Sequence, residues 1–327
     1  MRPLLCASLL LSTLGAASAQ EELARPASAE AVLIQEDGSF ASAWIIGATK
    51  TQIRYLDSPV DTDSTDMLIS KVKSVYLLEP KEFTKAVDLF QARQYQEAKS
   101  RFAAIKTRYK FMEAMPGNFS ALSAFYEMEC MRKLNDLEGL AAASQKFLKD
   151  PLIREYHRKQ VDLYVLWDAV RTKSWQRVDL LAKERLDEAL PGPLRAQIGY
   201  CHGLALEGLK KPTQALNAYN IALTADSGAS EEITRQAALN ILRIHKADEG
   251  VQLAISLWGK PEENKNSAGR FRLLEASAVA HLYEKLLSGG TPLPADFKGL
   301  LKYKKEEDQA TGTTPAESDA KEEKKED

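Results

Sequence analysis

The residues that most often carry catalysis or bind metals are few and widely spaced in this chain of 327 residues. There are four histidines, and none has a second ligand at the spacing of a zinc motif. They are His157, His202, His245 and His281. His202 directly follows Cys201, so on a helix the two side chains point about 100° apart and make poor joint ligands for one metal. We therefore expect packing roles for these histidines and no metal site.

An acidic segment around residue 61 is the nearest approach to a metal-binding motif. An EF-hand calcium loop that began at Asp61 would need glycine at its sixth position and a carboxylate at its twelfth. The chain has Asp66 and Val72 at those positions, so we expect a solvated acidic loop that also includes Asp63. The sequence has no glycine-rich phosphate loop, no Gly-x-Ser-x-Gly motif and no His-Glu-x-x-His motif. These observations predict a protein that is not an enzyme and that uses no cofactor.

Residues 1–19 have the features of a removable export signal. Arg2 supplies a positive charge, a short leucine-rich stretch follows, and Ala17 and Ala19 are small residues where a signal peptidase cuts, before Gln20. The apolar stretch is shorter than the roughly 20 residues that cross a bilayer as a helix, so a retained anchor is the less favoured alternative. We therefore predict export to the periplasm, the cell surface or the medium, with no membrane-spanning segment after cleavage.

Charge and cysteine content narrow the class of protein further. The formal net charge is −2, and acidic residues interleave with most of the basic ones, which argues against a nucleic-acid partner. Only Cys130 and Cys201 follow the predicted signal, too few for a disulfide-rich exported scaffold. We favour two buried thiols on helix faces, and one long-range disulfide is the alternative.

Residues 31–80 show the period of two that is typical of strands, after a polar, alanine-rich linker at residues 20–30. Asp37-Gly38 is a hairpin turn signal, because glycine adopts positive φ at little cost. Four or five short strands in this segment predict a small antiparallel β-barrel or curled sheet. The segment resembles the small SH3-like and Sm-like β-modules at the start of some bacterial envelope proteins. The residues that carry this resemblance are Asp37-Gly38, Gly47-Ala48-Thr49 and Ile53-Arg54-Tyr55.

From residue 81 to residue 301 the apolar residues recur with the helical period of 3.6. In the clearest unit, residues 194–226, Gly203 and Ala215 are small enough to let two antiparallel helices cross closely, and Tyr219 fills the gap to the next pair. The matching packing positions in this unit and in a second one, residues 82–109, are Ala86, Ala98, Phe102 and Ala222.

These units resemble the tetratricopeptide repeat (TPR). Three further units are degenerate, and in one of them, residues 119–151, we expect Leu140 and Phe147 to pack in the core. The equivalent positions of the five units are spaced by 36 to 42 residues, against the roughly 34 of the regular repeat. They are Ala98, Leu140, Val178, Ala215 and Val251. The resemblance implies a mainly α fold, an α-solenoid of TPR-like hairpins preceded by a small N-terminal antiparallel β-barrel-like domain.

Two segments end the chain. Residues 271–287 predict one more amphipathic helix, which would cap the open end of a solenoid. Residues 302–327 are rich in Lys, Glu, Asp, Thr and Ala and carry little apolar surface to bury. We predict that this charged tail is disordered.

The resemblance also implies a function, because the first helices of stacked repeats line a concave face that usually binds a protein or peptide. The residues that it would place on or near that face are Glu127, Arg132, Asp162, Asp168, Gln197 and His202. We predict an exported, non-enzymatic adaptor or scaffold for protein–protein interaction in the cell envelope. Neither the partner nor the residues that bind it follow from the sequence.

Aromatic residues leave two alternatives open. The β-domain could bind glycan or peptidoglycan through Trp44 and Tyr55, which requires that these rings be exposed. Trp167 and Trp175 lie eight residues apart around one predicted turn between helices. We favour core packing for both tryptophans, and a peptide-gripping role is the alternative.

Overall fold

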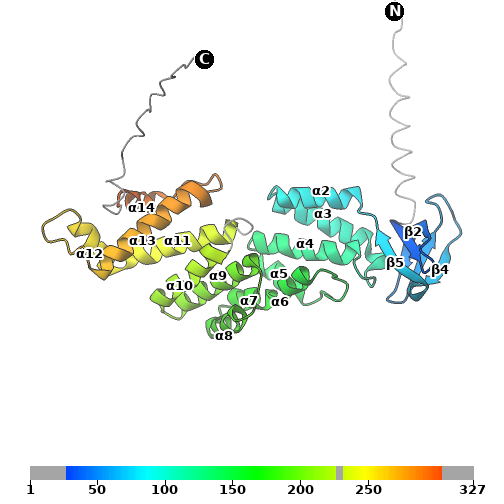
Figure 1. The fold of residues 1–327 in the computed structure, drawn as a ribbon, viewed down its shortest axis with the longest axis horizontal. Helices are drawn as coiled ribbons and strands as arrows, with labels where there is room; N and C mark the ends of the chain where they lie inside the picture. The colour runs from blue at the N-terminus through cyan, green and yellow to red at the C-terminus, as the bar shows by residue number, and fades with distance from the viewer. Residues whose placement is uncertain (1–26, 226–230, 304–327) are drawn as a thin grey trace, which may run out of the picture. The chain divides into compact units, whose positions relative to one another are not determined.

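A computed structural model describes residues 27–225 and 231–303 of the chain. The predicted signal at residues 1–19 and almost all of the predicted tail at 302–327 lie outside the described residues. The chain forms two compact units, Met1–Arg171 and Thr172–Asp327, and each is described by itself. Within the described part, the protein is mainly helical after a small N-terminal antiparallel sheet (Figure 1).

The sheet has five strands in the order β4-β3-β2-β1-β5, and every neighbouring pair is antiparallel. The strands are β1 (Ala29–Gln35), β2 (Phe40–Ala48), β3 (Gln52–Leu56), β4 (Thr65–Leu68) and β5 (Val72–Leu77). Asp37 and Gly38 lie in the β1–β2 turn, where Gly38 has a φ of 84° and Asp37 Oδ1 accepts from the Ser39 amide. Because β4 and β5 are opposite edges of this order, the sheet is open, in contrast to the barrel-like closure that we predicted.

One face of the sheet is buried against helices. Alternate residues of β1 and β2, such as Leu33 and Ile45, point into a core that also holds Phe83 and Phe102 from the first two helices. Pro80 therefore separates strand from helix but does not separate two cores. We infer that the sheet and the first helices unfold together.

Each helix packs on its neighbour in the chain over most of both units. In the first unit the helices are α2 (Lys81–Gln91), α3 (Tyr95–Arg108), α4 (Phe119–Lys133), α5 (Leu137–Ser144), α6 (Glu155–Asp162) and α7 (Tyr164–Arg171). In the second unit they are α8 (Trp175–Leu186), α9 (Gly192–Gly208), α10 (Pro212–Ala225), α11 (Glu231–Ala247), α12 (Glu249–Leu257), α13 (Ala268–Leu282) and α14 (Ala295–Lys298). One π turn, Tyr283–Leu287, continues α13. In addition, α4 contacts α2, and α11 contacts both α9 and α13.

The same kind of turn recurs at four places where one helix ends and the next begins. Its central residue has left-handed backbone geometry without being glycine, with φ values of 62°, 58°, 53° and 61°. These residues are Arg93, Asn135, Lys173 and Lys210. In three of the turns the same three hydrogen bonds recur: around Lys210, the amides of residues 209, 210 and 211 donate to the carbonyls of residues 205, 207 and 206. This is the Schellman arrangement that ends a helix.

The repeated turn sets the register of the helix that follows it. Five residues after each left-handed residue lies a fully or almost fully buried side chain of the second helix. These side chains are Ala98, Leu140, Val178 and Ala215. The other residues to which we assigned packing roles, Ala86, Phe102, Gly203, Tyr219 and Ala222, are also buried.

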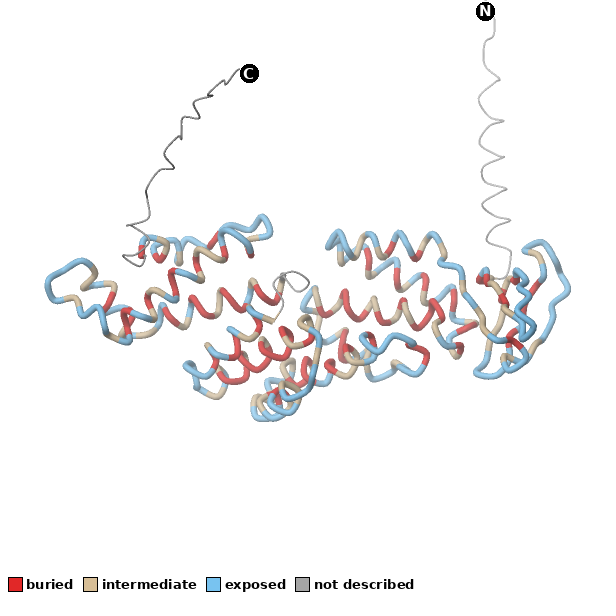
Figure 2. Tube along the Cα trace, viewed as in Figure 1, coloured by how far each residue is buried: buried red, intermediate tan, exposed pale blue. Residues whose placement is uncertain are grey.

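The two helices of the α9–α10 hairpin pack closely against each other. A methyl group on Gly203 would collide with the ring of Tyr219, and one on Gly199 would lie 2.8 Å from the Ala218 carbonyl oxygen. The backbones approach this closely only because both positions lack a side chain. As a result, α9 is buried over most of its length (Figure 2).

Candidate functional site

The second helix of the α4–α5 hairpin is unusually short. Helix α5 has 8 residues, whereas its counterparts α3, α8 and α10 have 14, 12 and 14. Pro151 contributes to this, because it has no amide hydrogen to donate to Phe147 and disfavours helical geometry at Asp150. Residues 145–154 therefore leave the helical path. Part of the surface of α3 and α4 that a longer second helix would cover stays open.

Two contacts fix the segment that replaces the missing turns of α5. The Gly117 amide donates to the Pro151 carbonyl oxygen at 2.8 Å. Arg158 Nε donates to the carbonyl of Leu152, whose side chain is buried. These contacts anchor one end of residues 145–154, so the groove beside them has a defined wall.

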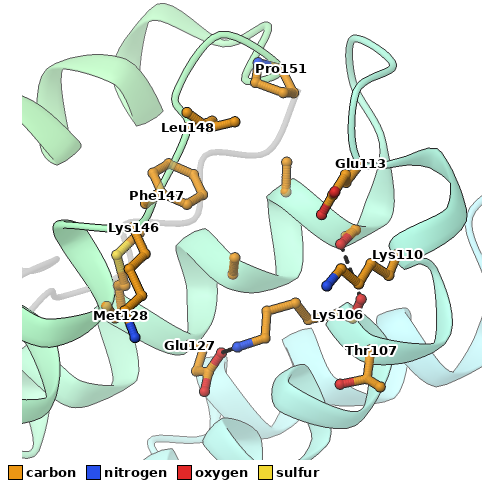
Figure 3. A pocket seen from close by; sticks show the side chains of 14 residues that line it. Lys106, Thr107, Lys110, Glu113, Glu127, Met128, Lys146, Phe147, Leu148 and Pro151 are labelled. Atoms are coloured by element: carbon orange, nitrogen blue, oxygen red, sulfur yellow. Dashed lines mark hydrogen bonds and ion pairs between the residues drawn. The ribbon is translucent and has the colours of Figure 1, made fainter. Parts of the chain in front are cut away.

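The open surface is a groove of about 600 Å³ (Figure 3). Its walls come from the end of α3, from one face of α4, and from the segment after α5. The lining residues are Lys106, Thr107, Lys110, Glu113, Ser120, Ala121, Ala124, Glu127, Met128, Ala143, Lys146, Phe147, Leu148 and Pro151. Its volume lies within the range typical of ligand-binding clefts.

The wall formed by the segment after α5 is apolar and exposed. Leu148 is 75% exposed and nearby Ile153 is 67% exposed, although both are large aliphatic residues. Phe147 is half-buried, and Figure 3 shows its ring on the same wall as Leu148. Met128 of α4 is buried and also lines the groove. Exposed apolar side chains beside a groove are typical of an interaction site.

Charged side chains flank the apolar surface. Lys106 Nζ and Glu127 Oε2 form an ion pair of 2.6 Å, so these two charges satisfy each other. Lys110, Lys146 and Glu113 form no ion pair with any residue that the structure describes. The groove thus presents two unpaired ammonium groups and one unpaired carboxylate to a ligand.

A buried polar network holds α4 in place beneath the groove. Arg132 and Glu129 form an ion pair of 3.0 Å, with side chains only 3% and 9% exposed. Tyr164 of α7 donates its hydroxyl to Glu129 at 2.8 Å, and the Arg132 guanidinium lies 5.8 Å from the Trp167 ring. Burial and the neighbouring Glu129 carboxylate raise the pKa of Tyr164. This network links α4 to α7 and limits how far the groove can deform.

Of the six residues that the resemblance suggested for partner binding, Glu127 lines the groove. Arg132, Gln197 and His202 are buried, and Asp162 and Asp168 form ion pairs with Lys149 and Arg171. The sequence pattern assigned no binding role to Lys110, Lys146, Phe147 and Leu148, and it predicted Phe147 in the core. The apolar Phe147-Leu148 pair just before Asp150-Pro151, at the end of a short helical stripe, was the available signal.

The histidines and cysteines have packing environments. His157 stacks on Phe125 with ring centroids 4.4 Å apart, and burial lowers its pKa. The other three lie near Asp179, Glu275 and the Leu301 carbonyl. Within residues 27–225 and 231–303, no group of three potential ligands could hold a metal ion. Cys130 and Cys201 are buried and do not form a disulfide, and burial raises the pKa of Cys130 to about 12.

The remaining candidates from the sequence are the aromatic residues and the acidic segment, and most of them lie in the first unit. Tyr55 is 9% exposed and belongs to the core, whereas Trp44 is half-buried. Asp66 forms an exposed ion pair of 2.8 Å with Arg54. Trp167 is buried. In the second unit, Trp175 packs over Gly208 in the α9 helix, which is a structural contact.

Comparison with protein-family models, with curated proteins and with solved structures found no match to this chain. No helix in the described part of the chain is both long and apolar enough to cross a membrane.

Proposed function

We propose that this protein is an exported, non-enzymatic adaptor of the cell envelope, built from TPR-like helical hairpins, and that the groove beside α4 holds an extended segment of a partner protein. The observation that carries the proposal is the groove itself. It combines an apolar wall that faces solvent with unpaired charges at its margins. Such a surface suits a peptide, which brings both apolar side chains and polar groups.

The repeated turns support the helical-repeat part of the proposal. Four turns place a left-handed residue five positions before a buried side chain, at intervals close to those of the predicted units. The second helix of one hairpin also packs on the first helix of the next, as in the α3–α4 and α10–α11 contacts. Stacked hairpins of this kind commonly serve as binding scaffolds.

The polar groups of the groove favour binding over catalysis. Ser120 Oγ donates to the Lys106 carbonyl at 3.0 Å, and Thr107 Oγ1 donates to the Ala103 carbonyl at 3.0 Å. Both hydroxyl hydrogens are thus engaged with the backbone. The Lys106 ammonium group is likewise engaged, in an ion pair of 2.6 Å with Glu127.

The glycan-binding alternative has less support. It required two exposed aromatic rings on the β-domain, and the Tyr55 ring is part of the core. A half-buried Trp44 alone gives a small stacking surface. We therefore retain the protein-binding proposal.

Site-specific photocrosslinking in the source cells tests the proposal. A photoreactive residue replaces Leu148 in the groove, and the control carries it at Leu180, which is 59% exposed on α8. We expect one partner segment to be captured from position 148 and not from position 180. The mapped segment, made as a synthetic peptide, should bind the purified protein. Identical products from both positions, or a peptide that does not bind, would refute the groove as the site.

The export part of the proposal has a separate test. The intact mass of the protein purified from its source should equal that of a chain that lacks residues 1–19. A mature protein that retains these residues would contradict cleavage before Gln20.

A further inference from the structure

Resting on the proposed function, we infer that the groove selects a short extended segment in which a bulky apolar side chain is flanked by acidic residues. The length of the groove, its apolar wall and the positions of its unpaired lysines lead to this inference.

The length of the groove limits the length of the segment. Its α4 wall runs from Ser120 to Met128. A rise of about 1.5 Å per residue makes this wall roughly 12 Å long. An extended chain advances about 3.3 Å per residue, so about four residues fit along it.

The apolar part of the groove calls for at least one bulky side chain. Phe147 and Leu148 stand on one wall, and Met128, Ala121 and Ala124 form the α4 side. The small alanines leave space that a leucine or phenylalanine side chain can fill. Burying such a side chain there would also remove exposed parts of Leu148 from water, which favours binding.

The unpaired charges favour an acidic ligand. Lys110 lies two residues after the end of α3, in a short 3-10 turn, and Lys146 comes from the opposite wall, beside Met128 (Figure 3). The three lysines and two glutamates of the lining sum to +1, and the Lys106–Glu127 pair leaves Lys110 and Lys146 against Glu113 alone. A carboxylate on each side of the apolar residue would neutralise both lysines.

Most of the basic residues near the end of α3 are paired with carboxylates. Lys99 pairs with Asp136, Arg101 with Glu97 and Arg108 with Glu82. The unpaired positive charge beside the groove is therefore that of Lys110 and Lys146. Because Glu127 and Glu113 also line the groove, a carboxylate beside an apolar side chain fits it better than a nucleic-acid strand does.

An array of blocked hexapeptides tests the inference on the full-length purified protein. The two central positions are Leu, Phe or Ala, and the flanking positions are Asp, Asn or Lys. We expect peptides with Leu or Phe between Asp residues to bind about fivefold more tightly than their Asn counterparts. Peptides with Ala at the centre, and those with flanking Lys, should bind more weakly still.

Variants of the protein make the test specific. K110E/K146E should reverse the preference, so that peptides with flanking Lys bind best. Lys85→Glu on α2 is the matched control, because Lys85 is exposed and outside the groove, and it should leave the preference unchanged. Phe147→Ala should weaken every peptide that has an apolar centre. Thermal unfolding of each variant verifies that the fold is retained.

The possible failures are distinguishable. Equal binding of the Asp and Asn peptides, with Phe147→Ala still weakening both, would overturn the acidic specificity and leave the proposed function standing. A preference that K110E/K146E does not alter would also overturn it. If no peptide binds in a way that depends on Phe147, the proposed function fails as well.

Discussion

In the α9–α10 and α4–α5 hairpins the same kind of turn joins the two helices, but the second helix differs in length. In α9–α10 the second helix has 14 residues, and Gly199 and Gly203 let the two backbones meet. In α4–α5 the second helix has 8 residues, and a groove remains. The regular hairpin buries its surface internally, whereas the shortened one leaves surface for a partner. The candidate site thus lies where the repeat departs from its own pattern.

The two hairpins also stabilise their first helix with related polar groups. In both, a tyrosine hydroxyl donates to a glutamate that an arginine also holds: Tyr164 to Glu129, and Tyr219 to Glu207. In α4 the glutamate and arginine side chains are 9% and 3% exposed, whereas Glu207 and its partner Arg243 are 19% and 56% exposed. We infer that the buried ion pair stabilises α4 in part, where close packing of the two helices stabilises α9–α10.

We expect the largest loss of stability when this buried network is broken. Glu129→Ala would leave the Arg132 charge buried without its carboxylate, and we expect a loss of about 3–5 kcal/mol in the free energy of unfolding. Glu207→Ala should cost only about 1–2 kcal/mol, because Arg243 remains solvated. Urea unfolding of both variants measures the difference. Equal losses would show that burial does not distinguish the two networks.

The next effect concerns the helix contact itself. Gly203→Val places a branched side chain against the Tyr219 ring, and we expect a loss of about 3 kcal/mol. Ala124→Val adds two methyl groups next to open space in the groove and should change stability by less than about 1 kcal/mol. Thermal unfolding compares them. A larger loss for Ala124→Val would mean that the groove is filled in solution.

A smaller loss of stability tests whether the sheet and the first helices unfold together. Ile45→Val removes one methyl group from the shared core and should cost about 1 kcal/mol. Hydrogen exchange should accelerate together in β2 and α3, because one core contains both. Acceleration confined to the strands would show instead that the sheet unfolds independently of the helices.

The smallest expected effects lie in the turns. Lys210→Gly relieves left-handed strain on a residue with a side chain, and we expect a gain of about 0.5–1 kcal/mol. Asn135→Gly should gain less, because asparagine tolerates this geometry better than lysine. Chemical denaturation of the two single variants checks the order. A loss at Lys210 would mean that its side chain makes a stabilising contact.

The periodicity of the sequence predicted the regular parts of the fold because small and large residues alternate there in a recognisable way. The sizes and spacing of Gly203, Ala215 and Tyr219 are enough to imply a close crossing of two helices. The groove was not predicted, since it depends on where α5 ends and on how residues 145–154 return to Gly117. The same pattern of apolar residues that indicated a packed helix placed Phe147 in the core. Apolar periodicity alone does not distinguish a side chain that faces the core from one that faces an empty groove.

The most direct test of the central claim is to fill the groove. Ala124→Phe introduces a ring between α4 and the Phe147 wall, in space that a ligand would occupy, and Leu180→Phe on the exposed surface of α8 is the control. Binding of the crosslinked partner segment to both purified variants should be measured by fluorescence anisotropy. We predict that Ala124→Phe folds with nearly unchanged thermal stability and loses binding, while Leu180→Phe binds normally. A folded Ala124→Phe variant that binds the segment with unchanged affinity would contradict the groove as the binding site.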